Sequence, residues 1–344
     1  MDNDNMGSAV AELPVVARRA FLGRAGRFAT VGAIVAIAAC SEGDESPLAN
    51  TPTPTPSGTP TPTPAASPSI LPVSDVDLLT LMVQLQYLQA EFYARAVLGA
   101  PLASSLVTGA GAAGDVVGPR AVTIADPILA DYLREIAVEK IDQLVRLRAV
   151  LGSAVPARPA LNLSMEAGGS FARYATEATP VTVPATAPVL TDVYAGQDQL
   201  LLGAFVLEDA VVSAWRGIAT LMTSAANIDV AAGMLATCAF HAGLIRSQLF
   251  LRGGATGSVL RTATVRLSDL RDSFTPTVDD DRGVSSGSGS SLAADINPSD
   301  GEGEIYGRLP NLTINTFYMT RSVATSGGFF PAGLNGVLRE SVFT

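Results

Sequence analysis

The stretch LLGAFVLEDAVVSAW, residues 201–215, carries Glu208 in a strongly apolar run, and Trp215 follows seven residues later. The earlier stretch LQYLQAEFY, residues 85–93, places Gln86 seven residues before a tyrosine in the same way. Seven residues make two helical turns, so the members of each pair share a helix face. Two apolar helices that each turn a polar side chain inward predict a helical bundle with a polar centre.

Two further apolar stretches carry side chains of the kinds that bind metals. REIAVEKID, residues 134–142, has two acidic residues three apart, and CAFHAGLIR, residues 238–246, has a cysteine and a histidine three apart. Three residues are nearly one helical turn, so each pair lies on one face. We predict that six side chains converge inside a four-helix bundle, in a metal site that has lost some of its ligands: Gln86, Glu139, Asp142, Glu208, Cys238 and His241.

Start and stop signals predict where the four helices lie. Ser74 and Asp77 form a capping-box pattern, and Asp126-Pro127 is a cap followed by a proline at the first helical position. The predicted helices run from 74 to about 98, 126 to 151, about 192 to about 222, and 227 to about 253. The fourth has no charge between Asp229 and Arg246, which predicts a central place in the bundle.

The connections and the C-terminal part differ in composition from the helices. The connection 153–190 is long enough to cross the length of a bundle. Residues 255–344 mix short β-like runs, 258–267 and 312–319, with an acidic Gly/Ser-rich loop. We expect an all-α bundle over residues 74–254, with an irregular C-terminal cap over 255–344 whose acidic loop is solvated.

The N-terminal residues have the pattern of an export signal. Arg18 and Arg19 form a twin-arginine motif, and the apolar run that follows is too short to span a bilayer. The run ends in Ile37-Ala38-Ala39-Cys40, which favours a lipoprotein signal over residues 1–39 and a lipid on Cys40. The alternative is an ordinary cleaved signal peptide with a chance cysteine. The Thr/Pro-rich residues 40–73 predict a semi-rigid stalk, and hence an extracytoplasmic protein tethered to a membrane.

The overall composition restricts the function. The 344 residues carry a formal charge of −10, which argues against a nucleic-acid partner. Hydrophobic residues make up 48% and charged residues 16%, enough for a large buried core. With Cys40 lipidated, Cys238 has no partner for a disulfide. The oligomeric state stays open at this point, a dimer included.

Together these motifs resemble the desiccation-related, ferritin-like proteins of bacteria (ferritin-2 type). The resemblance covers about residues 74–339 and extends to tail motifs such as Gly327-Gly328-Phe329-Phe330-Pro331. It implies a ferritin-like bundle with a long crossover. The matching positions divide into those that keep the family's residue type, Glu139, Glu208 and His241, and those that depart from it, Gln86, Asp142 and Cys238.

The resemblance leaves two functions open. A complete ferritin-like site uses four Glu and two His, so the loss of half of them disfavours a di-iron oxidase. The first interpretation is a non-catalytic protein with a structural, protective or binding role and a relic polar network. The alternative is a metal-binding oxidoreductase or iron-handling protein with one Fe or Zn ion, held by Glu139, Glu208, Cys238 and His241.

Overall fold

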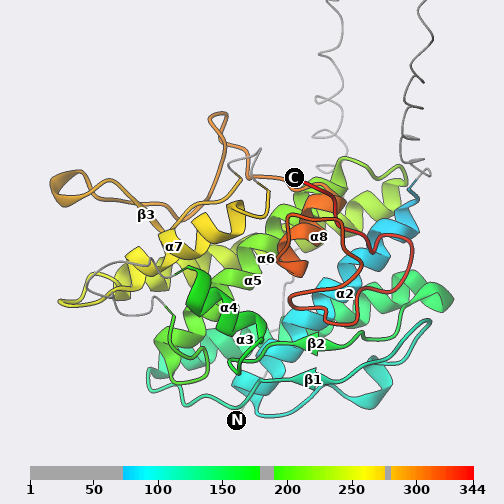
Figure 1. The fold of residues 1–344 in the computed structure, drawn as a ribbon, viewed down its shortest axis with the longest axis horizontal. Helices are drawn as coiled ribbons and strands as arrows, with labels where there is room; N and C mark the ends of the chain where they lie inside the picture. Colours follow the sequence, from blue (N-terminus) through cyan, green and yellow to red (C-terminus); the bar gives the residue numbers. More distant parts are fainter. Residues whose placement is uncertain (1–72, 179–189, 276–279) are drawn as a thin grey trace, which may run out of the picture. The chain divides into compact units, whose positions relative to one another are not determined.

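Four long helices form the body of the protein (Figure 1). They are α2 (Asp75–Tyr93), α3 (Pro127–Leu151), α5 (Gln197–Ala219) and α6 (Ala225–Arg252). A computed structural model describes residues 73–178, 190–275 and 280–344. The predicted signal peptide, Cys40 and almost all of the stalk lie outside these residues. The all-α bundle predicted from the sequence is confirmed.

The helix starts follow the predicted capping chemistry. Ser74 Oγ accepts the backbone N–H of Asp77 at 3.2 Å, and Asp77 Oδ2 accepts that of Ser74 at 3.0 Å. Asp126 Oδ1 accepts the backbone N–H of Ile128 at 3.0 Å, ahead of α3. These bonds satisfy amide groups that have no partner within a helix. Helix α2 continues into a π-helical turn, Ala94–Leu98.

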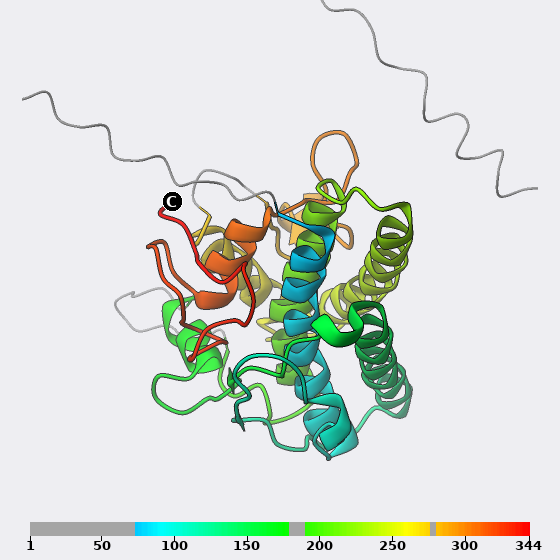
Figure 2. The same ribbon diagram turned by 90° about the vertical axis from the view of Figure 1, so that its right-hand side faces the viewer.

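The helices lie in layers (Figure 2). Helices α2 and α5 stand in the middle, with α3 packed on α2 and α6 packed on α5. On the opposite side lie α4 (Ser170–Glu177), α7 (Leu260–Asp272) and α8 (Pro310–Tyr318). The helices enclosed on all sides are therefore α2 and α5, in which residues 81–93 and 200–215 are all buried.

The prediction that residues 227–253 form the central helix is wrong. Helix α6 lies at the edge, with Phe240 80% exposed and Leu251 67% exposed. It is the one helix among the described residues that is long and apolar enough to cross a membrane, yet only 33% of its most apolar window is buried. An uncharged sequence shows that a helix tolerates burial on every side, but it does not say which neighbours cover it.

The β-like runs predicted in the cap are also wrong, because both are helical. Residues 258–267 contribute to α7 and residues 312–319 to α8. The buried positions of α7 recur every three or four residues, as in Leu260, Ala263 and Leu267, which is a helical period. Strand pairing in the described residues is short: β1 (Val116–Val117) lies parallel to β2 (Leu161–Asn162), and β3 (Ser285–Ser286) antiparallel to β4 (Ala293–Ala294).

The C-terminal tail is fastened to the bundle by Asn335. Its side-chain amide donates to the carbonyls of Ala112 and Ala157, at 3.0 Å each. Its backbone N–H donates to Gln84 Oε1 on α2 at 2.5 Å. One asparagine thus joins the tail, both connections and the first helix, and residues 255–344 belong to the same compact unit as the helices.

Candidate functional site

A lysine lies at the polar centre of the bundle. Lys140 of α3 is fully buried, and its Nζ lies 2.8 Å from Glu208 Oε2 on α5. The same ammonium donates to Gln89 Oε1 of α2 at 3.2 Å and lies 3.6 Å from Cys238 Sγ of α6. All four long helices therefore contribute a polar side chain to one interior point, and a cation from the chain itself lies there.

The electrostatics of this centre are those of an ion pair in a dry core. Burial raises the pKa of Glu208, and the Lys140 ammonium opposes that rise. Burial acts to lower the pKa of Lys140, but Cys238 and Glu208 together raise it above its ordinary value, so the ammonium keeps its proton. Burial also raises the pKa of Cys238, which therefore stays a thiol. The pair is neutral overall, which limits the cost of burying it.

Neutral amides surround the ion pair. Gln86 Nε2 donates to the Lys140 carbonyl at 2.8 Å and to Gln143 Oε1 at 3.1 Å. The Tyr93 hydroxyl and Gln89 Nε2 make no hydrogen bond of good geometry in the described residues, although both side chains help to lower the pKa of Glu208. Gln86, a predicted site residue, thus contacts α3 through its amide nitrogen, and its Oε1 has no partner among the described residues.

The predicted pair on α3 is wrong by one residue. Lys140 and Gln143 face inward, whereas Asp142 is exposed and the Glu139 side chain is 42% exposed. Both pairs have the same spacing of three residues, so spacing alone does not separate them. The apolar period does, because it runs from Leu133 through Lys140 to Leu147.

The sequence holds another signal that identifies Lys140. It is the only lysine in the 344 residues, and every other basic side chain is an arginine except His241, the only histidine. All the other long basic side chains of this protein are arginines, so a single lysine within an amphipathic helix indicates a position where the compact ammonium fits and the larger guanidinium does not.

His241 belongs to a different contact. Its Nε2 lies 2.5 Å from Glu139 Oε2, at the edge of a groove between α3 and α6. Burial, and then the Lys140 ammonium, lower the pKa of His241 to about 3, so the imidazole is neutral and its Nε2–H donates a hydrogen bond to the Glu139 carboxylate. Burial raises the pKa of Glu139. The Nδ1 atom of His241 is buried and has no partner among the described residues.

The six predicted ligands therefore divide into two groups and an outlier. Gln86, Glu208 and Cys238 surround Lys140, Glu139 and His241 pair with each other, and Asp142 faces solvent. Within the described ranges, no three His, Cys, Asp or Glu side chains are arranged to hold a metal ion.

The centre does not fit the metal pair that the resemblance implies. Its one carboxylate is already neutralised by Lys140. A divalent ion about 4 Å from the ammonium would be repelled by about 8 kcal/mol at an effective dielectric constant of about 20. That is more than half of the roughly 10–16 kcal/mol with which structural zinc sites bind.

A second polar cluster joins α5 and α6 to α7 and the cap. Arg246 Nη1 donates to Asp209 Oδ2 at 2.8 Å, and Arg271 Nη2 donates to Asp281 Oδ1 at 2.6 Å. Arg308 pairs with Asp280. The acidic loop is therefore not solvated at this point, contrary to the prediction: Asp280 and Asp281 are 3% and 4% exposed.

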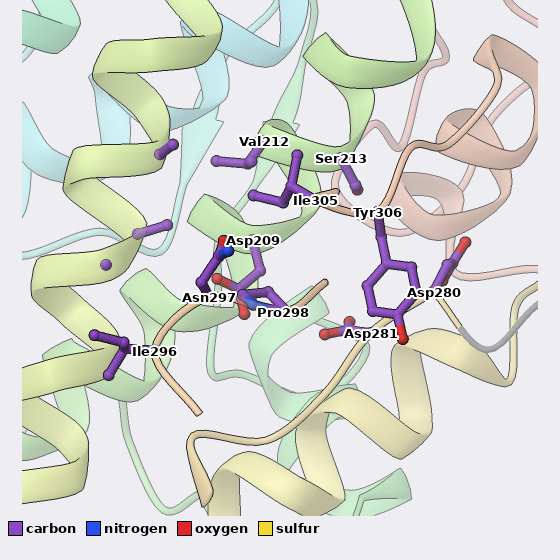
Figure 3. Close-up of a pocket in the computed structure, with 13 residues that line it drawn as sticks. Asp209, Val212, Ser213, Asp280, Asp281, Ile296, Asn297, Pro298, Ile305 and Tyr306 are labelled. Carbon is purple, nitrogen blue, oxygen red and sulfur yellow. The ribbon is translucent and has the colours of Figure 1, made fainter. Parts of the chain in front are cut away.

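The cavity beside this cluster is small (Figure 3). Asp209, Asp280 and Asp281 line it together with Tyr306. Its volume of about 20 Å³ is close to the space that one water molecule needs. We assign the cluster to holding the cap on the bundle, because each of its arginines already pairs with a carboxylate.

The fold and the four-helix polar centre define a ferritin-like bundle. The sequence model of a family described as Ferritin-like domain matches residues 74–251, and the chain belongs to that family. Neither the curated proteins nor the solved structures searched give a match.

Proposed function

We propose that this protein is an exported, membrane-tethered ferritin-like protein whose bundle centre works without metal catalysis, in a structural, protective or binding role. The observation that carries the proposal is the buried Lys140–Glu208 ion pair, at 2.8 Å. An ammonium at this point provides the positive charge that carboxylates at the centre of such bundles otherwise receive from metal ions. The replacement favours a permanent core over a reactive centre.

The charge balance supports this reading. A buried carboxylate is tolerated only when it is paired or protonated. Lys140 pairs Glu208, and Gln86 and Gln143 carry no charge, so the centre is balanced without a metal. Cys238, with its raised pKa, adds no thiolate that would call for another cation.

Metal binding by matched variants tests the proposal. Anaerobic titration with Fe²⁺ followed by O₂, and with Zn²⁺ followed by elemental analysis, should give no stoichiometric uptake by the wild-type protein. The variant Gln86→Glu/Lys140→Glu/Gln143→His/Cys238→Glu restores carboxylates and imidazole on the faces that point inward, and it should bind metal. The control replaces Gln143→His by Asp142→His and should bind less, because residue 142 faces solvent. Stoichiometric, rapidly oxidised Fe²⁺ in the wild type would refute the proposal and favour the oxidoreductase alternative.

Export and tethering rest on the N-terminal motifs. Arg18, Arg19 and the box ending at Cys40 motivate them. Mass spectrometry of protein from the native host should find a mature chain that begins at an acylated Cys40. Cys40→Ala should move the protein from the membrane fraction to the soluble fraction, and Arg18→Lys/Arg19→Lys should keep it in the cytoplasm. A mature membrane-bound protein with an unmodified N-terminus would contradict the tether.

A further inference from the structure

The outer face of α6 is apolar and uncovered. Figure 2 shows α3 and α6 together on the right, with no other described element over their outer side. Phe240 is 80% exposed and Leu251 is 67% exposed, and no charged residue lies between Asp229 and Arg246. Continuous apolar surface of this kind marks an interaction site in most soluble proteins.

A groove runs beside this face. Helices α3 and α6 pack on α2 and α5 rather than closely on each other. One part of the groove, about 410 Å³, is lined by Tyr132, Ile136 and Phe240 among others. A second part, about 390 Å³, shares Thr237 with the first and extends toward Val230. A large apolar side chain from a partner fits into such a space.

We propose that the α3–α6 face is a homodimer interface, in which α6 packs antiparallel on α6 of a second copy. The argument is self-complementarity, which a two-fold interface requires. Residues four apart form one stripe along α6, and its four central members are two small residues, Ala232 and Ala236, followed by two large ones, Phe240 and Leu244. The stripe consists of Ile228, Ala232, Ala236, Phe240, Leu244 and Gln248.

An antiparallel partner matches this stripe position by position. With the two-fold axis midway between Ala236 and Phe240, each Phe240 faces the partner's Ala236. In the same register each Leu244 faces the partner's Ala232. At these four central positions each large side chain thus meets a small one, which lets the two helices approach closely, and Ile228 faces Gln248 at the ends of the stripe. Parallel packing would place Phe240 against Phe240 and leave Ala236 against Ala236.

Charge favours a second copy over a membrane surface. Each chain carries −10, so two copies repel overall, and the uncharged α6 stripe is the part of this face where a second copy makes no close contact between like charges. A lipid surface would have to accept the charged rim that α3 presents beside the stripe, which is acidic on balance and unfavourable near anionic lipids. The rim residues are Asp131, Arg134, Glu135, Glu139, Asp142 and Arg146.

The face is large enough for a stable dimer. Helices α3 and α6, each about 35 Å long and about 10 Å wide, together present about 700 Å² per copy. Stable interfaces bury about 800 Å² per partner, with a few central aromatic residues carrying much of the affinity. Phe240 lies near the middle of α6 and is the expected anchor.

Sedimentation velocity of the full chain tests the interface. The chain carries Cys40→Ser, so that no acyl group contributes to association. We expect a dimer at micromolar concentration that added salt strengthens, because salt screens the repulsion between two acidic copies. Phe240→Glu should weaken dimerisation at least about 100-fold, since two buried phenyl rings are lost per dimer. Phe343→Glu is the matched control, because Phe343 is 81% exposed but lies in the C-terminal tail.

Cross-linking tests the register without removing the anchor. An equal mixture of Ala232→Cys and Leu244→Cys chains should form disulfide-linked heterodimers on oxidation, and Ala232→Cys alone should not. Cys238 is buried and should not react. The proposal is overturned if the wild type stays monomeric at high concentration, if Phe240→Glu leaves the dimer intact, or if Phe240→Glu abolishes only binding to anionic vesicles. Cross-linking by Ala232→Cys alone overturns the antiparallel register.

Discussion

Replacing Lys140 by methionine keeps most of the side-chain volume and removes the charge that pairs Glu208. The carboxylate then stays buried only by taking up a proton. Its ordinary pKa is 4.5. Each pH unit above that value costs about 1.4 kcal/mol for protonation, so Lys140→Met should lose up to about 3 kcal/mol of unfolding free energy at pH 7 and less than about 1 kcal/mol at pH 5. The folded variant binds one proton more than the unfolded chain, so its stability falls as pH rises.

The reciprocal variant should show the opposite slope. Glu208→Gln leaves Lys140 unpaired, and a buried lysine escapes its charge by losing a proton. That loss costs more as pH falls below its ordinary pKa of 10.5, up to about 5 kcal/mol at pH 7. The double variant Lys140→Met/Glu208→Gln has neither charge, so its stability should follow the pH dependence of the wild type.

Urea unfolding of the four proteins at several pH values between 5 and 8 measures these slopes. The coupling energy from the double-mutant cycle should reach several kcal/mol, because breaking a buried pair exposes the cost of the remaining charge. Equal slopes in all four proteins, or losses in the two single variants that simply add, would refute the claim that the two groups form a dry ion pair.

Four shorter predictions test other parts of the structure. In the wild type the pKa of His241 is about 3, below its ordinary 6.5, so the protein loses stability as pH falls from about 6.5 toward 3. His241→Gln should remove this loss, and thermal unfolding from pH 7 to 4 measures it. Burial and Asp281 raise the pKa of Asp272 to about 8, so the stability of the wild type falls as pH rises from about 4 toward that value. Asp272→Asn should make the stability less dependent on pH in this range. Gly217→Ala should lose about 1–3 kcal/mol by overpacking against the Arg308 backbone, while the control Gly233→Ala, with open space around it, should lose nothing. An amine-reactive acetylating reagent should modify Lys140 only after unfolding, as read by mass spectrometry of the peptide that contains it.

The parts of the fold that depend on local chemistry follow from the sequence. The caps at Ser74 and Asp126 fix the starts of α2 and α3, because a cap is a bond between residues two or three apart. Tyr93 and Trp215 are buried for a similar reason, since both lie on strongly apolar helices that any bundle must cover.

The errors lie where the answer depends on distant residues. On α3 the residue types at 139 and 142 are those that bind metals, and on that ground the sequence prediction turns them inward. The apolar period of the helix instead indicates that Lys140 and Gln143 face inward, as they do. A buried lysine contradicts the expectation from composition unless its partner is known, and that partner lies on α5, 68 residues away.

The position of α6 shows the same limit. Its sequence allows burial on every side, but among the described helices α2 and α5 are the ones that the fold encloses, over residues 81–93 and 200–215. The acidic loop is the reverse case: Asp280 and Asp281 suggest solvent exposure, and only the fold shows that Arg271 and Arg308 reach them. In both cases the number of available partners decides burial.

One physical argument connects Lys140 at the centre of the bundle with the Glu139–His241 pair at the α3–α6 groove. A ferritin-like centre with exchangeable metal ions needs charged ligands whose repulsion is relieved only by the ions. Under the proposed function a lysine from the chain supplies that positive charge, while Glu139 and His241 pair with each other at the α3–α6 groove. The centre and the outer face do not share these residues, so variants at Lys140 should alter stability without altering dimerisation, while variants at Phe240 should do the reverse.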